Sequence, residues 1–172
     1  MRLFLSWKHI ISLCCVLVYL SSSLAHATVV PKQHRLLIIN SYNEGAPWSQ
    51  TLITPIMLQT SSIEDVNADL VHINGTFIRN DSLYNQMEEG IFQRYERNKP
   101  DYLVLIGSIA FTLRDRIQKE WGDIPMVLIA NEDTYAPREY YFTGRSKNME
   151  DNTVAPLNDI REQYNFTFIE AP

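Results

Sequence analysis

Cysteine is nearly absent from this chain of 172 residues. Cys14 and Cys15 are the only two, and both lie in the apolar run Ile10–Leu20, which is typical of an export signal. Without that signal, the mature chain can form no disulfide and must be stabilised by packing alone. This favours a medium-sized bacterial periplasmic domain over a small disulfide-bonded secreted scaffold, and it excludes thiol catalysis and thiolate metal sites.

The motifs of common enzyme classes are missing as well. With only six glycines, the chain has no P-loop, no Gly-x-Ser-x-Gly elbow and no Gly-x-Gly-x-x-Gly after any predicted strand. The mature chain keeps two histidines, His34 and His72. Neither has a helix-spaced partner for zinc or the position of a triad base, so both are interpreted as structural. The sequence therefore predicts a non-enzyme with no cofactor and no metal site.

Positive charge is also scarce. Of 15 basic residues, Arg2 and Lys8 belong to the export signal, which leaves 13 against 20 acidic residues in the mature chain. No cluster of Lys and Arg occurs. Nucleic acid is therefore excluded as a partner, because affinity for it depends largely on cations that neutralise phosphates.

The N-terminus has the three parts of a signal peptide. Arg2 and Lys8 precede the uncharged run Ile10–Leu20, and Ala25-His26-Ala27 supplies the small residues of a cleavage site. We predict cleavage after Ala27 and a periplasmic or otherwise exported chain. The alternative is a retained membrane tether, but the uncharged run falls well short of the roughly 20 apolar residues that span a bilayer.

Continuous apolar runs indicate buried strands. Leu36–Ile39, Leu103–Ile106 and Met126–Ile129 are each apolar throughout and bounded by polar or turn residues, as parallel strands covered on both faces are. Ala68–Ile73 mixes polar and apolar positions, which favours a strand nearer the edge. Phe166–Ile169 is a further candidate strand.

Helical periodicity separates these runs. Leu83, Met87, Ile91 and Tyr95 recur every four residues, with Asp81 or Ser82 as the expected cap. A second predicted helix runs from Ile109 to Trp121 on Ile109, Leu113, Ile117 and Trp121, with Ser108 as its expected N-cap. A third covers Trp48–Thr60, in which Pro55 either kinks the helix or marks a late start after Thr54. Residues 157–164 are expected to form a short helix.

The alternation of strands and helices predicts one α/β lobe over residues 28–172, following a signal peptide at 1–27. We expect three layers, with a mostly parallel, flavodoxin-like sheet and helices on both faces.

Ligands of open α/β sheets bind at the carboxyl ends of the strands. Three loops qualify: Asn40–Trp48, Gly107-Ser108 and Asn131-Glu132-Asp133. The first combines orienting polar groups with Tyr42 and Trp48, although these rings can equally cover the sheet. The second can be only a turn and a helix cap, and the third only a solvated loop.

Several blocks of sequence resemble a known bacterial family. The run Arg35–Tyr42 and the following Pro47-Trp48 resemble the opening of the extracytoplasmic sensor domains of two-component histidine kinases, often hybrid ones. These domains are related to the solute-binding proteins of ABC transporters. Lys99–Gly107 resembles the family's "kPDlIl" strand and Ile124–Ala130 its "iPVVf" strand. The resemblance extends from the first of these blocks to the end of the chain.

The resemblance implies a periplasmic-binding-protein-like fold, in which two α/β lobes close on a small ligand. Because this chain has the length of one lobe, we expect an N-terminal lobe truncated before the second. The ligand-binding residues that the resemblance implies are Ser41, Tyr42 and Trp48 after the first strand, Ser108 after the third, and Asn131 and Glu132 after the fourth.

The function implied by the resemblance is small-molecule sensing by a non-catalytic lobe of a sensor histidine kinase, whose full-length form would permit a homodimer. The alternative is a truncated solute-binding component of an ABC transporter. A third hypothesis, from a different class, is a periplasmic hydrolase that uses Glu132 and Asp133 as a carboxylate pair.

Overall fold

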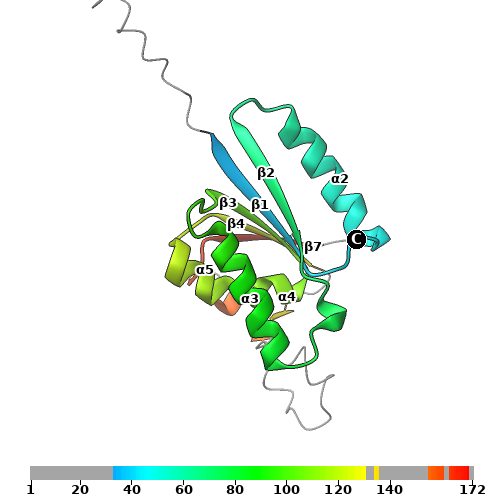
Figure 1. The fold of residues 1–172 in the computed structure, drawn as a ribbon, viewed down its shortest axis with the longest axis vertical. Helices are drawn as coiled ribbons and strands as arrows, with labels where there is room; N and C mark the ends of the chain where they lie inside the picture. Colours follow the sequence, from blue (N-terminus) through cyan, green and yellow to red (C-terminus); the bar gives the residue numbers. More distant parts are fainter. Residues whose placement is uncertain (1–32, 131–133, 136–154, 161–162, 171–172) are drawn as a thin grey trace, which may run out of the picture. The chain divides into compact units, whose positions relative to one another are not determined.

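The computed structural model describes residues 33–130, 134–135, 155–160 and 163–170. Five parallel strands form its central sheet (Figure 1). In spatial order they are β2, β1, β3, β4 and β7, which is the order 2-1-3-4-5 when the strands of this sheet are counted along the chain. This is flavodoxin-like topology, so the predicted fold class is confirmed. The strands are β1 (His34–Asn40), β2 (Val66–His72), β3 (Tyr102–Ile106), β4 (Met126–Ala130) and β7 (Phe166–Glu170).

The interior strands β1, β3 and β4 are those predicted from continuous apolar runs. Their side chains meet protein on both faces of the sheet, which is why neither face of these strands carries a polar stripe. β2 lies at one edge beside β1, and β7 lies at the other edge beside β4. The mixed sequence of β2 matches its place at the edge, because polar residues there can reach water.

Helices cover both faces of the sheet (Figure 1). The helices on one face are α3 (Asp81–Tyr95), α4 (Ser108–Phe111) and α5 (Arg114–Trp121). On the other face, α2 (Pro47–Ser61) packs over a smaller core that includes Ile38, Ile53 and Val104. The remaining described elements are the 3-10 helices η1 (Gly75–Phe77) and η3 (Leu157–Ile160) and the antiparallel pair β5 (Thr134–Tyr135) and β6 (Ala155–Pro156). The helix predicted over 157–164 is the 3-10 helix η3 at its start, and the described residues 163 and 164 at its end are not helical.

The buried face of α3 differs from the predicted one. Leu83 is 41% exposed, whereas its neighbour Tyr84 is only 1% exposed. A strict four-residue repeat drifts by about 40° per step around a helix of 3.6 residues per turn, so Leu83 and Tyr95 cannot share one face. The predicted caps Asp81 and Ser82 were also wrong, since Asn80 is the N-cap and its side chain accepts a hydrogen bond from the Leu83 N–H.

α2 begins at Pro47 and runs through Pro55, so of the two alternatives, a kink or a late start, the late start is wrong. Pro47 costs the helix little because it lies in the first turn, where its missing N–H would have no helical partner. Trp48 and Ile53, which both precede Pro55, pack against the core on this face of the sheet. This tertiary contact stabilises α2 despite the proline inside it.

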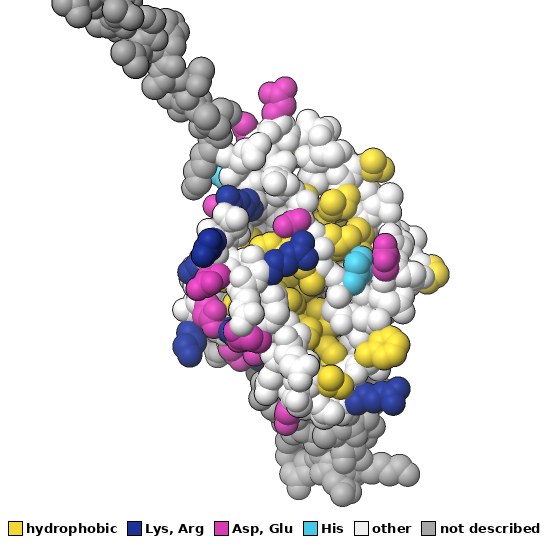
Figure 2. All heavy atoms as spheres, in the orientation of Figure 1, with side chains coloured by type: hydrophobic (Ala, Val, Ile, Leu, Met, Phe, Trp, Pro, Cys, Tyr) yellow, Lys and Arg dark blue, Asp and Glu magenta, His cyan; other side chains and the backbone are white. Residues whose placement is uncertain are grey.

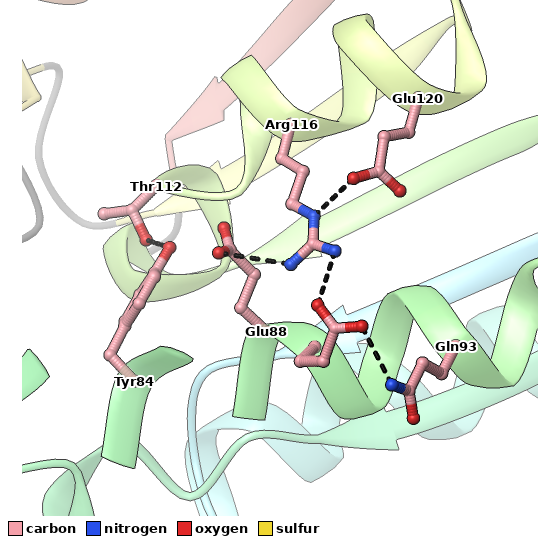
Figure 3. Close-up of polar contacts among 7 residues, drawn as sticks. Tyr84, Glu88, Gln93, Thr112, Arg116 and Glu120 are labelled. Carbon is pink, nitrogen blue, oxygen red and sulfur yellow. Dashed lines mark hydrogen bonds and ion pairs between the residues drawn. The ribbon is translucent and has the colours of Figure 1, made fainter. Parts of the chain in front are cut away.

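The single helix predicted from Ile109 to Trp121 is two helices, α4 and α5. Between them the Leu113 N–H bonds to the Ala110 carbonyl, three residues back, which tightens the turn. The Thr112 hydroxyl also hydrogen-bonds to the Tyr84 hydroxyl at 2.8 Å (Figure 3). Ser108 is not the N-cap of α4, because Gly107 occupies that position and Ser108 begins the helix.

A charged cluster joins α3 to α5 (Figure 3). Arg116 donates hydrogen bonds of 2.7 Å to both Glu89 and Glu120, and its guanidinium lies 3.4 Å from Glu88. The same guanidinium stands 4.4 Å from the centre of the Phe92 ring. The hydrogen bond from Arg116, aided by one from Gln93, lowers the pKa of the Glu89 carboxyl. These carboxylates of α3 are therefore engaged in helix packing.

Candidate functional site

The sheet has one topological switch point, between β1 and β3. From β1 the chain crosses outward to β2, and from β3 it crosses in the opposite direction to β4. The loops that follow β1 and β3 therefore leave the sheet on opposite sides. Open α/β sheets bind their ligands at such a point, and we refer to the carboxyl ends of these two strands as the crevice. Three of the six predicted ligand-binding residues, Ser41, Tyr42 and Ser108, directly follow these two strands.

Ser41 joins three segments at the floor of this crevice. Its N–H donates to the Ile106 carbonyl, its carbonyl accepts from the Gly75 N–H, and its hydroxyl accepts from the Ala110 N–H, each at 2.8 Å. The residue is only 6% exposed. The hydroxyl thus satisfies a backbone donor in the first turn of α4, a role that sequence reasoning gave to Ser108. Ser41 is a positioning residue for the crevice.

Two glycines allow these backbones to meet. Gly107 has φ of 83°, and a Cβ there would lie 2.9 Å from both the Ser41 hydroxyl and the Tyr42 ring. A Cβ on Gly75 would collide with the end of the Ile109 side chain and approach the Ser41 carbonyl oxygen at 3.1 Å. Only glycine fits both positions without movement of the crevice floor.

Tyr42 and Trp48 lie together at the top of the sheet. Their ring centres are 5.1 Å apart and the ring planes are inclined at 68°, an edge-to-face arrangement. Trp48 packs against the core beneath α2, whereas Tyr42 is 37% exposed. Trp48 therefore supports Tyr42, and the Tyr42 ring is the member of the pair that a ligand can reach.

A buried polar network beneath this pair holds the first loop. The Asn40 amide nitrogen donates to the Ser49 hydroxyl at 3.2 Å and to the Tyr42 carbonyl at 3.3 Å, and it lies 2.9 Å from Nδ1 of His72. Ser49 in turn donates to the Ala46 carbonyl. Asn40 and Ser49 are completely buried. Sequence reasoning placed Asn40 in the loop but missed its role, for which the only signal was an amide directly after an apolar run.

Ser108 lies at the other wall of the crevice, directly after Gly107, and is partly buried. Asn131 and Glu132, together with the Asp133 of the hydrolase hypothesis, lie outside the described residues. They follow Ala130, the last residue of β4, whose neighbour in the sheet is β3.

Within the described part of the chain, no group of three His, Cys, Asp or Glu side chains lies close enough to hold a metal ion. The adjacent carboxylates Glu88 and Glu89 both pair with Arg116 of α5. The crevice itself offers hydroxyl, backbone and aromatic groups, which can orient a ligand.

Within the described ranges, no helix is both long enough and apolar enough to cross a bilayer. Comparison of the chain with protein-family models, curated proteins and solved structures finds no match. The resemblance to sensor domains therefore stays a prediction, whereas the flavodoxin-like topology of the sheet is observed in the structure.

Proposed function

We propose that this chain is an exported, non-catalytic lobe that binds a small molecule at the switch point of its sheet, as part of a sensor histidine kinase. The observation that supports the proposal best is the convergence at one crevice of the exposed Tyr42 ring, the Ser108 wall and a floor fixed by Ser41. Open α/β sheets place their ligand sites at this point of the topology.

Binding rather than chemistry is favoured by what the crevice groups already do. Ser41 is only 6% exposed and its hydroxyl accepts from the Ala110 N–H, so this hydroxyl is poorly placed to act as a nucleophile. His72, the histidine closest to the first loop, has its Nδ1 beside the Asn40 amide and not beside a serine hydroxyl. A rigid floor with an exposed aromatic ring can instead stack on a flat ligand.

A thermal-shift titration tests this site. The probes are glucose, adenosine and indole, which represent a sugar, a nucleoside and an aromatic ring. We expect one of them to raise the melting temperature, and Tyr42→Ala to weaken its binding about tenfold, because the stacking ring is lost.

The matched control is Tyr102→Ala, since Tyr102 is 44% exposed but begins β3, at the opposite end of that strand from the crevice. Equal loss of binding in both variants would show that the ring at the crevice is not the contact, and the absence of a shift with all three probes would count against a stacked ligand.

The sensor role and the transport role differ in genetic context. DNA downstream of the Pro172 codon that encodes a second lobe, a membrane helix and kinase motifs would support sensing. Neighbouring permease and ATPase genes would support a solute-binding protein of an ABC transporter instead.

A further inference from the structure

A second hollow lies toward the other end of β1 and β2, near the point where these strands begin. Strand register sets its wall, because Arg35 pairs with Asn67 and Leu37 pairs with Asp69. Alternate residues of a strand share a face, so these four side chains lie on the face covered by α3. The last turn of α3 and the residues after it close the other wall with Arg94 and Asn98, around a volume of about 230 Å³.

Apolar residues lie at the base of the hollow, but most of the surface that the hollow exposes is polar. Leu37, Tyr95 and Pro100 line it and are buried. Figure 2 shows basic and acidic side chains beside apolar ones near the centre of the drawn face. Arg35 and Arg94 bring two positive charges against the single negative charge of Asp69, so the lining has a net positive charge in a chain where acids outnumber bases.

The single carboxylate is already engaged. Asp69 accepts a hydrogen bond of 3.2 Å from the Tyr95 hydroxyl. Burial of the ring, reinforced by this carboxylate, raises the pKa of Tyr95 to about 12, so the phenol stays protonated and keeps donating to Asp69.

The guanidinium of Arg94, by contrast, has donors to spare. It lies 4.0 Å from Asp69 and 5.3 Å from the centre of the Tyr95 ring, distances that orient the group without forming a hydrogen bond. Within the described part of the chain, the side chains of Arg35, Asn67 and Asn98 likewise make no hydrogen bond. Four exposed polar side chains therefore have N–H groups that a ligand in the hollow can use.

We propose that this hollow binds a small organic acid through its carboxylate. The Arg94 fork would hold the carboxylate, since guanidinium matches two carboxylate oxygens at once. Arg35 adds a second cation, the amides of Asn67 and Asn98 supply further donors, and the apolar stem of the acid would lie on Leu37 and Tyr95. The hollow is smaller than the roughly 300–1,000 Å³ of pockets for drug-sized ligands, so the acid must be short.

NMR titration of the ¹⁵N-labelled full chain tests the proposal. Butyrate and benzoate are the carboxylate probes, butyramide and benzamide are their neutral counterparts, and inorganic phosphate is the competing oxyanion, all at matched ionic strength. We expect saturable shifts of the Asp69 and Asn98 amides with the carboxylates only. Arg94→Gln should raise the Kd about tenfold, because it removes a charged hydrogen-bonding group.

Arg97→Gln is the matched control, because Arg97 is exposed just beyond the same helix and does not line the hollow. It should leave the Kd unchanged. The proposal is overturned if neither carboxylate gives saturable shifts, if the neutral amides bind equally well, or if Arg94→Gln binds as the parent chain does. Tighter binding of phosphate than of either carboxylate would overturn the assignment to organic acids.

Discussion

At the scale of single residues, the crevice depends on side chains that are small or absent. Ser41 fits between three backbone segments because its hydroxyl is both compact and able to accept the Ala110 N–H. Gly107 and Gly75 leave room for Ser41, Tyr42 and Ile109, which would otherwise clash with a Cβ. The residues that shape this site are therefore different from the residue that a ligand would touch, which is Tyr42.

Two Gly→Ala substitutions separate the crevice from an ordinary helix position. Gly107→Ala should lower the free energy of unfolding by about 2 kcal/mol, because alanine is strained at positive φ and its Cβ would press on Ser41. Gly90→Ala, in the exposed part of α3 with open space around it, should raise stability by about 0.5–1 kcal/mol. Urea unfolding measures both. If Gly107→Ala leaves the free energy of unfolding unchanged, the backbone around Ser41 adjusts to the added Cβ at little cost.

At the scale of elements, local patterns were sufficient for the strands. Continuous apolar runs predicted β1, β3 and β4 because a strand covered on both faces has no polar side. The predicted helices were wrong in two respects: which residues α3 buries, and where α4 ends and α5 begins. Leu83 was assigned to the buried face of α3 by a repeat that drifts around the helix. The break between α4 and α5 lies at Thr112, whose hydroxyl bonds to that of Tyr84 on another helix.

The candidate site was predictable only as far as strand ends are predictable. Loops after parallel strands meet at one edge, so the sequence could bring Ser41 and Ser108 to the same region. It could not show that the Ser41 hydroxyl is bonded to Ala110, because the two residues are 69 positions apart and meet only when β1 lies beside β3. The roles of Asn40 and Ser49 were missed for a different reason: the two residues are only nine positions apart, but nothing in the sequence shows that both polar side chains are buried.

The link between α3 and α5 should make stability depend on pH on the acid side. Arg116 lowers the pKa of Glu89 in the folded chain, so ionised Glu89 stabilises the fold above its ordinary pKa. That contribution is lost as the pH falls through the lowered folded pKa. We expect Glu89→Gln to be less stable than the parent chain near neutral pH and to lose less stability on acidification, as followed by urea unfolding at a series of pH values.

Glu64→Gln is the control for this experiment. Glu64 is an exposed carboxylate in the turn before β2, and no ion pair is described for it. Its acid-side slope should follow that of the parent chain. If the slopes of Glu89→Gln and the parent chain coincide, the Arg116 cluster does not couple protonation to folding.

At the scale of the whole molecule, export is the prediction with the simplest test. If the N-terminal segment is a cleaved signal, protein recovered from the periplasm of an expressing bacterium begins at Thr28. Edman sequencing or intact mass measures this start directly. A chain that keeps Met1 and stays with the membrane fraction would instead identify the segment as a tether.

The order of the strands also governs when the crevice can exist. β1 and β2 are joined by a single crossover through α2, so this unit can assemble from neighbouring segments. The opposite side of β1 stays open until β3 docks, and the Ser41–Ala110 bond closes only afterwards. Contacts between distant segments form slowly because the loop must first be closed. We expect the crevice to form after the β1–α2–β2 unit, so that a ligand held there would select chains that have finished folding over chains that are still folding.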